Sequence, residues 1–425
     1  MNYFILTIFI FTYLFLIFGK INKLLVVGLA TALLILSGTI SPGQAFSFVN
    51  WNVMAIFVGM LVLADLFIDS RVPAFLARTL ANKAKTTAMA FILICALTSF
   101  ISAFVENVAT VLIIAPLAIS LARHLRIKVA PFLIGIAVCS NLQGTATLVG
   151  DPPSMILAGF SKMTFNDFFW FKGSPGIFFA VQAGAIISIF VLYLIFRRHT
   201  RGVGELYKVN VKSWTPTILI ILLIISLALA SIYGSQFHYL AGIITLAYAL
   251  IGLIWLLIKE DIHTLPGLLK PLDWNTSVFL FCIFIIVGSL ESGGIIEALT
   301  STMKSLTAGN VFLTYSIILW FSVIISAVID NVPYILIMLP VTAGLAVHLG
   351  VSPYLFYFSL LLGASVGGNI TPIGASANIV SVGIAKKKAG EDISFWQFFK
   401  IGLPFTLSAV TVSWLIGWFF WQNLV

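Results

Sequence analysis

The sequence predicts an all-α polytopic membrane protein that consists of two inverted repeats. The composition, a duplicated motif and the distribution of basic residues lead to this prediction. Of the 425 residues, 60% are hydrophobic and only 9% are charged, and apolar runs of about twenty residues recur along the chain. Soluble globular domains do not have this composition. The sequence contains no Walker A motif, which argues against ATP-driven transport by this chain alone.

A broken apolar segment in each half of the chain is the strongest evidence for duplication. Residues 144–154 recur as residues 368–378, 224 positions later, and the same shift relates Asn107 to Asn331. Glycine and proline in each segment interrupt the helix. Backbone released from a helix at membrane depth must line a cavity or be buried in protein, and broken helices of this kind mark the binding sites of secondary transporters.

Each repeat is expected to contain five transmembrane spans, one of them the broken helix, plus a paired segment. Because five is odd, the second repeat enters the membrane from the opposite side. The first repeat comprises residues 1–198, with the pair at 86–124 and the break at 131–160; residues 199–214 form a cytoplasmic linker; the second repeat comprises 215–425, with the pair at 309–349 and the break at 353–385. The sequence leaves open whether each pair is a re-entrant hairpin or two full spans.

The other spans are expected at 3–18, 24–40, 53–68, 176–196, 215–232, 239–258, 276–290 and 403–420. With the N-terminus outside, 20 of the 23 Lys and Arg fall on the cytoplasmic side, as the positive-inside rule requires. Lys20, Lys23, Lys208 and Lys270 are among these cytoplasmic residues. Every Lys and Arg lies in a loop or at a span end, so none is expected beside the binding site. We therefore predict a multi-pass plasma-membrane protein with both termini outside.

Acidic residues within apolar segments are the candidates for ion coupling. Glu106 and Asp330 are equivalent, each followed by Asn-Val, whereas Asp151 in the first break has Ala375 as its counterpart. An intramembrane carboxylate is costly, which makes a function the first hypothesis. The alternative for Glu106 and Asp330 is a water-facing loop between two full spans, and for Asp151 a helix N-cap.

The polar residues of the paired segments and breaks are the predicted binding residues. Half-helix N-termini attract anions, whereas unwound carbonyls, Asn, Thr and carboxylates suit Na⁺ or a proton. The predicted residues are Asn107, Thr110, Asn141, Gly144, Thr145, Thr147, Gly150 and Asp151 in the first repeat, and Asn331, Gly368, Asn369, Thr371, Gly374, Ser376 and Asn378 in the second. Candidate Na⁺ ligands are Asn107, Thr147, Asn331 and Thr371.

Three further features are predicted to be structural. Cys95, Cys139 and Cys282 lie in apolar segments, where we expect packing rather than a disulfide or a metal. Residues 363–367 match the nucleophile-elbow pattern G-x-S-x-G, but in a transmembrane run close helix packing is the favoured interpretation. Residues 395–399 are expected to form a short interfacial helix before the last span. No enzymatic activity is predicted.

At these motifs the sequence resembles the ion transporter superfamily. This superfamily includes arsenite permeases, NhaD-type sodium/proton antiporters, the melanosomal P protein, and citrate and divalent-anion/sodium symporters. The closest resemblance is to the arsenite-permease and P-protein branch, where the pattern N-x-G-G-T-A-T-L-I-G-D-P-P-N recurs. Here it stands as residues 141–154, with Gln143 and Ser154 departing from it. The hairpin pattern Asp-Asn-Val-x-Thr stands as residues 106–110, with Glu first, and as residues 330–334, with Tyr last.

The resemblance implies re-entrant hairpins, elevator-like alternating access and a scaffold domain that often forms a homodimer. It also implies that Asn and Thr residues of the tips and breaks bind Na⁺ and a carboxylate substrate. By motif match this carries to Asn107, Thr145, Thr147, Asn331, Thr371 and Asn378.

We therefore expect a secondary active transporter that moves a small anion or arsenite, coupled to H⁺ or Na⁺, with no other cofactor and no nucleic-acid partner. The alternatives are a Na⁺/H⁺ antiporter without an anion substrate and an anion channel.

Overall fold

The computed structural model describes residues 2–18, 21–203, 209–237, 239–259, 272–307 and 309–424. Lys20, Lys270 and residues 204–208 of the predicted linker, which include Lys208, lie outside the described residues. Within the described part, eight helices are long and apolar enough to cross a membrane. The protein is thus a multi-pass, all-α membrane protein.

The elements of the first half follow the predicted order closely. They are α1 (Tyr3–Phe18), α2 (Lys23–Leu36), α3 (Pro42–Phe48), α4 (Trp51–Asp69), α5 (Val72–Asn82), α6 (Thr87–Ser102), α7 (Asn107–Leu125), α8 (Ala130–Gly144), α9 (Pro152–Ser161), β1 (Trp170–Phe171), β2 (Ser174–Pro175) and α10 (Ile177–Phe196). The strands form a small antiparallel hairpin in which Trp170 pairs with Pro175.

The second half repeats this order of long helices. Its elements are α11 (Thr215–Ala230), α12 (Leu240–Lys259), α14 (Trp274–Ser292), α15 (Ile295–Thr307), α16 (Val311–Ser326), α17 (Asn331–Leu349), α18 (Tyr354–Gly367), α19 (Ser376–Ile384) and α20 (Phe395–Trp421). The expected separate helix at 395–399 is wrong, because α20 continues through it. Pro404 lies inside this helix without ending it.

Both predicted breaks are present, and the same hydrogen bonds build them. The Thr147 hydroxyl donates to the Ala103 carbonyl, and the Thr371 hydroxyl donates to the Ala327 carbonyl. The two threonines are 224 positions apart in the sequence, and so are the two alanines. Each bond ties the unwound segment to the turn of its own helix pair, so backbone released from the helix finds protein partners instead of lipid.

Further pairs of contacts repeat at the same spacing. Ser154 Oγ donates to the Gly144 carbonyl at 3.2 Å, and Asn378 Nδ2 donates to the Gly368 carbonyl at 2.9 Å. A Cβ on Gly150 would lie 2.5 Å from the Gly144 oxygen. The corresponding distance from Gly374 to the Gly368 oxygen is 2.6 Å. Each break therefore closes into a loop that only glycine permits.

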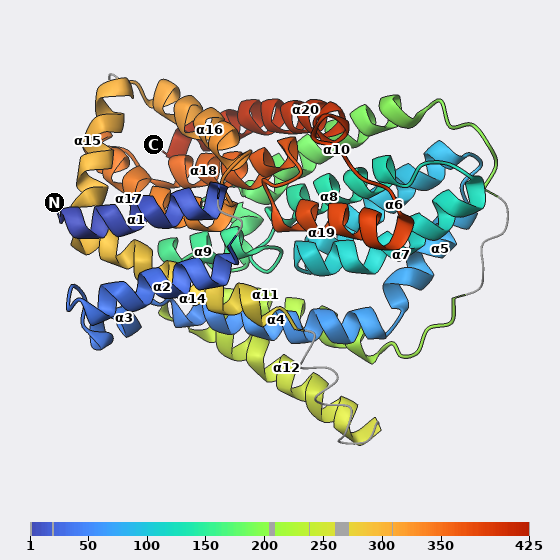
Figure 1. Cartoon of the computed structure of the whole chain (residues 1–425), viewed down its shortest axis with the longest axis horizontal. Coiled ribbons are helices and arrows are strands. Elements are labelled where there is room, and N and C mark those ends of the chain that lie inside the picture. The colour runs from blue at the N-terminus through green and yellow to red at the C-terminus, as the bar shows by residue number, and fades with distance from the viewer. Residues whose placement is uncertain are drawn as a thin grey trace.

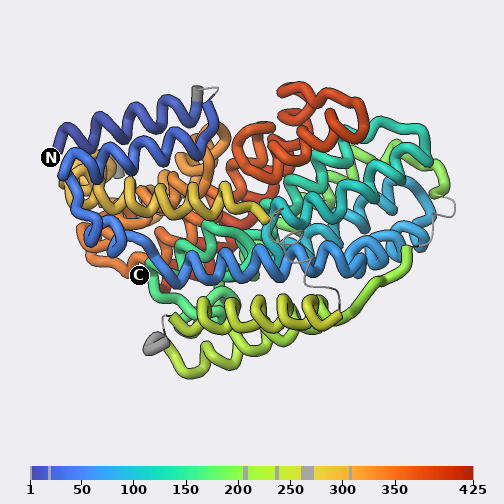
Figure 2. The backbone as a smooth tube through the Cα atoms, turned by 60° about the horizontal axis from the view of Figure 1, so that its bottom comes forward, coloured from blue at the N-terminus to red at the C-terminus, as the bar shows by residue number. Residues whose placement is uncertain are grey.

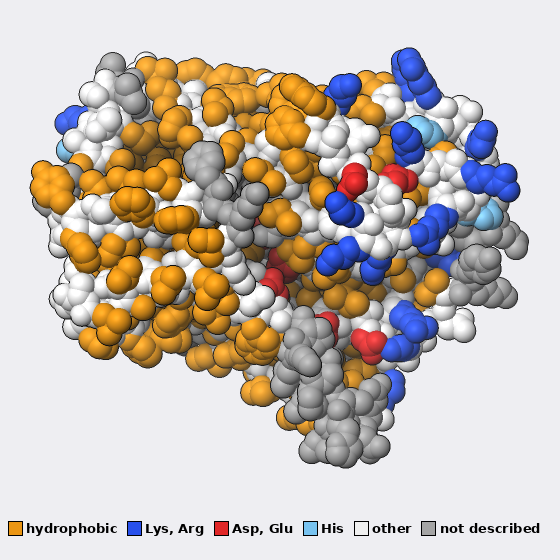
Figure 3. All heavy atoms as spheres, viewed as in Figure 1, with side chains coloured by type: hydrophobic (Ala, Val, Ile, Leu, Met, Phe, Trp, Pro, Cys, Tyr) orange, Lys and Arg blue, Asp and Glu red, His pale blue; other side chains and the backbone are white. Residues whose placement is uncertain are grey.

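The two helix pairs lie at opposite ends of the molecule. Figure 1 shows α6 and α7 towards one end of the long axis and α16 and α17 towards the other. The half-helices cross between these ends: α9 packs on α17 and α18, whereas α19 packs on α7 and α8. Lys and Arg side chains gather at the end that holds α5, α6 and α7 (Figure 3), opposite both chain termini (Figure 1).

Two groups of helices can be distinguished by their packing. Helices α1, α2, α4, α11, α12 and α14 form one group, which we call the outer group. The pairs α6–α7 and α16–α17 form the other, the inner group, together with α8, α9, α10 and α18 to α20. In Figure 2 the α11–α12 pair lies alongside the rest of the molecule. It packs on α4, where a Cβ on Gly242 would lie 2.8 Å from the Ala55 Cβ.

Several hydrogen bonds join the two halves around α8. The Glu391 carboxylate, which follows α19, accepts from the backbone N–H groups of Val129 and Ala130 at 2.9 Å. These N–H groups belong to the start of α8, where a helix has no internal partners for them. Farther along, Asn369 Nδ2 donates to the Val138 carbonyl at 3.1 Å. The second half thus completes the hydrogen bonding of a helix in the first.

Candidate substrate and ion site

A cavity of about 160 Å³, which we call the tip cavity, lies where the tips of both helix pairs meet. It contains seven of the predicted residues: Glu106, Asn107, Asn141, Asp151, Asp330, Asn331 and Ser376. The N-termini of both half-helices, at Pro152 and Ser376, also border it. Residues from both breaks and both tips therefore share one small polar space.

Glu106 and Asp330 begin the second helix of each pair in the same way. The Glu106 carboxylate accepts from the Ala109 N–H at 2.9 Å, and the Asp330 carboxylate accepts from the Val332 N–H at 3.3 Å. Both residues are N-caps. However, Glu106 is only 9% exposed, which does not fit a water-facing loop. Both capping carboxylates also line the tip cavity.

Asp151 differs from these two carboxylates. It occupies the N-cap position of α9, as the alternative predicted, but its side chain makes no capping hydrogen bond. The side chain is 5% exposed, interacts with the Asn107 amide, and lies within electrostatic range of both Glu106 and Asp330. A buried carboxylate without a structural role in its own helix is available to bind a cation.

Asn107 is held in place by the first break. Its Oδ1 accepts from Ser102 Oγ at 2.7 Å, and a Cβ on Gly144 would lie 2.3 Å from that same oxygen. Gly144 therefore makes room for the Asn107 side chain, which explains a glycine that the sequence identified only as a helix breaker.

Three asparagines connect the two breaks behind the tip cavity. Asn141 Nδ2 donates to both Asn369 Oδ1 and Asn378 Oδ1, each at 2.8 Å. Asn378 also donates to the Thr371 carbonyl at 2.8 Å. Asn369 and Asn378 are fully buried. Of the three, Asn141 alone lines the tip cavity, so the other two position it.

The remaining predicted residues do not line the tip cavity. They are Thr110, Gly144, Thr145, Thr147, Gly150, Gly368, Asn369, Thr371, Gly374 and Asn378. The hydroxyls of Thr110 and Thr145 donate to the carbonyls of Val105 and Asn141. Together with the threonine bonds described above, these contacts assign the buried threonines a structural part in the tips and breaks.

Lys23 lies at the tip cavity, which the sequence did not predict. Its Nζ is 3.5 Å from Asp330 Oδ2, and the side chain lines the cavity. The expectation that no Lys or Arg lies beside the site is therefore wrong. Lys23 is the first residue of α2, and this helix begins at the tip cavity. Asn275 and Thr276 at the start of α14 are further lining residues that were missed.

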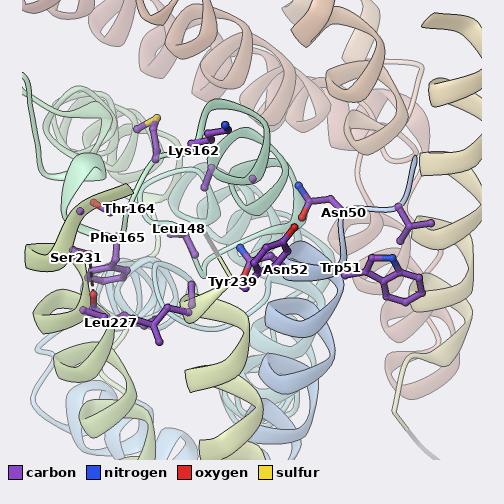
Figure 4. Close-up of a pocket in the computed structure, with 18 of the residues that line it drawn as sticks. Asn50, Trp51, Asn52, Leu148, Lys162, Thr164, Phe165, Leu227, Ser231 and Tyr239 are labelled. Atoms are coloured by element: carbon purple, nitrogen blue, oxygen red, sulfur yellow. Dashed lines mark hydrogen bonds between the residues drawn. The ribbon is translucent and has the colours of Figure 1, made fainter. Parts of the chain in front are cut away.

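A second cavity, of about 570 Å³, lies at the start of α4; we call it the α4 cavity. Figure 4 shows Asn50, Trp51 and Asn52 along one side of it, with Leu227, Ser231 and Tyr239 of the α11–α12 pair and Lys162 also at its border. Asn52 Oδ1 accepts from the Gly242 N–H at 2.9 Å. The cavity is bordered by the C-terminal end of α9, whereas the tip cavity meets the N-terminal end.

Two sequence interpretations of a structural role are supported. The three cysteines are buried and free. Residues 363–367 lie within α18, where a Cβ on Gly363 would be 2.3 Å from the Leu319 oxygen of α16. The glycines therefore permit close helix packing, and Ser365 is buried within a helix rather than on an elbow. Among the described residues, no three His, Cys, Asp or Glu side chains could together hold a metal ion.

Known proteins of similar sequence include transporters. A family model described as citrate transporter matches residues 13–363 and 335–423. An uncharacterized transporter of Mycobacterium tuberculosis is 30% identical over 432 residues, which cover 97% of both chains. The P protein of Mus musculus is 24% identical over 461 residues, which cover 90% of this chain and 55% of the P protein.

A solved structure shares the fold. The crystal structure of the YdaH transporter of Alcanivorax borkumensis aligns with a TM-score of 0.61 at 16% identity, over 90% of this chain and 87% of that one. At this identity the likeness concerns the fold alone.

Proposed function

Because this chain belongs to the citrate transporter family, we propose that it is a secondary active transporter that moves a small anion coupled to H⁺ or Na⁺ by alternating access. The tip cavity is the observation that carries this proposal. Two half-helix N-termini, at Pro152 and Ser376, converge on it. Their positive dipole ends attract an anion. The start of α19 also offers the N–H groups of Ser376 and Ala377, whereas Pro152 and Pro153 at the start of α9 have none. The amides of Asn107 and Asn331 offer further hydrogen bonds, whereas both N–H groups of Asn141 are already used.

The charges around the cavity support coupling to a cation. Glu106, Asp151 and Asp330 line it, with Lys23 as the basic residue of the lining. Three ionised carboxylates repel a bare anion, so the substrate enters together with protons or Na⁺ that neutralise them. The family description names citrate, and we propose that the substrate is a small carboxylate of that kind, with arsenite as the alternative substrate.

Equivalent helices occupy different places, which supports alternating access. Trp51 and Trp274 begin α4 and α14 at positions 223 residues apart. The start of α14 lines the tip cavity at the N-termini of the half-helices, whereas the start of α4 lines the α4 cavity at the C-terminal end of α9. α9 has 10 residues, so the two places are about 15 Å apart along it.

In the opposite state we propose that these two places are exchanged. The inner group slides relative to the outer group until the start of α4 reaches the tips and the start of α14 leaves them. We expect this exchange in an inverted repeat, because each half then takes the conformation of the other. The repeated hydrogen bonds and the opposed helix pairs support the inverted-repeat relation. They also favour re-entrant hairpins, since both tips border one cavity.

Two further parts of the proposal concern the membrane and assembly. The gathering of Lys and Arg at one end supports a cytoplasmic position for that end, with both termini outside at the plasma membrane. We propose that the protein forms a homodimer in which the outer groups of the two chains pack against each other. Labelling of a C-terminal tag in intact cells tests the orientation, and native mass spectrometry tests the dimer.

A Na⁺/H⁺ antiporter without an anion substrate is the second candidate. The excess of three carboxylates over one lysine in the tip cavity favours it. Candidate Na⁺ ligands remain Asn107, Thr147, Asn331 and Thr371, through side-chain or backbone oxygens. An anion channel is the third candidate, and single-channel recording would reveal it by unitary currents.

The deciding experiment measures flux in proteoliposomes that contain a pH-sensitive dye. Na⁺ or Li⁺ is added outside, first alone and then with arsenite, citrate, succinate, sulfate or chloride. A response that requires one anion supports the proposal and identifies the substrate. A response to the cation alone supports the antiporter and rejects the anion substrate.

Variants of the tips test the site itself. Asn107→Ala and Asn331→Ala should each abolish flux while the protein remains inserted, and Asn423→Ala, an exposed residue near the C-terminus, is the matched control. Normal flux in either tip variant would remove that tip from the site.

A further inference from the structure

We propose that Lys23 is an internal counter-cation that holds the Asp330 tip in the present state and is displaced when the transported cation binds there. The transported cation is taken from the proposed function, whereas the pair itself is an observation. Nothing in the sequence indicated this role, because Lys23 was expected with the cytoplasmic basic residues.

The pair joins the two groups of helices. Lys23 belongs to α2, which packs on α1 and α14 in the outer group. Asp330 belongs to the turn between α16 and α17 in the inner group. The contact is therefore broken whenever the inner group slides relative to the outer group. An ion pair across a sliding interface favours the one state in which it forms.

The position of Lys23 is fixed by the N-cap of its helix. Asn22 is the N-cap of α2, and its side chain accepts from the Leu24 N–H at 2.9 Å. The Lys23 side chain is 44% exposed and that of Asp330 is 20% exposed. An arriving cation can thus reach the pair, and Lys23 can withdraw into water when it is displaced.

Several other charged or titratable groups surround Asp330. Glu106 and Asp151 lie across the tip cavity, and Asp273 caps the start of α14 nearby. Tyr13 of α1 is buried within electrostatic range of Asp330. The α19 side presents Ala375, Ser376 and Ala377, which carry no charge. Lys23 is therefore the basic side chain of the described cavity lining, facing three carboxylates.

The equivalent place in the other half has no lysine. The shift of 223 residues that relates Trp51 to Trp274 relates Lys23 to Leu246, which lies within α12. When the start of α4 and this part of α12 reach the tips, they bring no cation in the place of Lys23 to Glu106. The opposite state then carries one more uncompensated carboxylate, and a bound proton or Na⁺ must replace Lys23. Because of this asymmetry, we expect the transporter to change state only when it is loaded.

A zero-length cross-link tests the pair in the full-length protein. In proteoliposomes, a carbodiimide joins the Lys23 amine to the Asp330 carboxylate, and mass spectrometry measures the product. Lys212 and Asp69 form an exposed ion pair on the same protein and serve as the internal reference. The ratio of the two products cancels the reagent's own dependence on pH and salt. We expect this ratio to fall at least about threefold on addition of Na⁺, or of acid in a Na⁺-free buffer.

Flux measurements test the consequence. Lys23→Gln removes the competitor, so the cation concentration at half-maximal flux should fall about three- to tenfold. Lys23→Arg keeps the charge and should stay close to the wild type. Lys212→Gln, the matched control, should leave the cation concentration at half-maximal flux unchanged.

The proposal is overturned if the reference pair cross-links and the Lys23–Asp330 pair does not. It is equally overturned if Lys23→Gln keeps the half-maximal concentration of the wild type. Absence of flux in the wild type would instead reject the proposed function, and the cross-link ratio would still report on the pair.

Discussion

The two breaks have the same frame but different chemistry. In each break a threonine bonds the turn of the adjacent helix pair, and a glycine closes the loop. The first break then adds Asp151 to the tip cavity, where the second offers Ala375. Conversely, the first has Ser154 where the second has Asn378, which joins Asn141. The duplicated contacts maintain the loops. The residues that differ give the first break a carboxylate and give the second break the hydrogen bond that joins the two halves.

The strongest test of the shared frame is a Cβ at the closing glycine. Gly150→Ala and Gly374→Ala should both prevent correct folding, at a cost of about 3 kcal/mol or more, because the added carbon would meet backbone that cannot move aside. Thermal stability in detergent measures the effect. Gly28→Ala, with no atom within 4 Å of the new Cβ, is the control. A stable protein from one glycine variant alone would mean that the two frames are not equivalent.

The charge difference is tested by moving the carboxylate. Asp151→Asn should lower flux at least about tenfold with little loss of stability, because the side chain makes no capping bond. Ala375→Asp in that background places a carboxylate at the equivalent position of the other break. We expect it to restore no flux, since the site is asymmetric. Recovery of flux would show that either half can carry the charge.

Glu106→Gln tests whether the tip without a lysine takes part in coupling to the cation. It removes a carboxylate but keeps the N-cap acceptor, so the protein should remain stable while flux loses its dependence on the coupling cation. Asp330→Asn is the matched variant at the other tip. Flux as a function of pH and Na⁺ gives the comparison, and an unchanged dependence in Glu106→Gln would exclude it from coupling.

The smallest effect is expected at the residues that close each break. Asn378→Ala should destabilise the protein by about 2–3 kcal/mol, because it leaves the partners of three hydrogen bonds unpaired. Ser154→Ala loses one bond of 3.2 Å and should cost about 1 kcal/mol. Chemical denaturation or thermal melting measures both. If both variants lost the same stability, the hydrogen bond from Asn141 to Asn378 would contribute nothing measurable.

The main features of the fold could be predicted because glycine, proline and apolar length act locally. These signals located both breaks and both helix pairs to within a few residues. The amphipathic connecting helices α5 and α15 were missed, since their apolar residues are too few to suggest a span. The continuous α20 was missed because Pro404 usually ends a helix.

The candidate site was predicted only in part, because its lining depends on packing between distant segments. Seven predicted residues share the tip cavity, since duplicated tips and breaks converge. The threonines looked equally suitable, but their hydroxyls are used by nearby carbonyls, which spacing cannot show. Lys23 was missed because the sequence places it at the start of a helix but does not show that Asp330 lies next to that helix start.

The cap that Glu391 provides for α8 has a consequence for biosynthesis. A ribosome makes the chain from its N-terminus, so α8 leaves it about 260 residues before the carboxylate that satisfies its first N–H groups. Asn369 and Ser381, which bond carbonyls farther along α8, are also made late. During synthesis the first half therefore contains an unfinished helix next to an open loop. We expect it to reach its final form only when nearly the whole chain has been inserted, which makes the late segment a point of quality control.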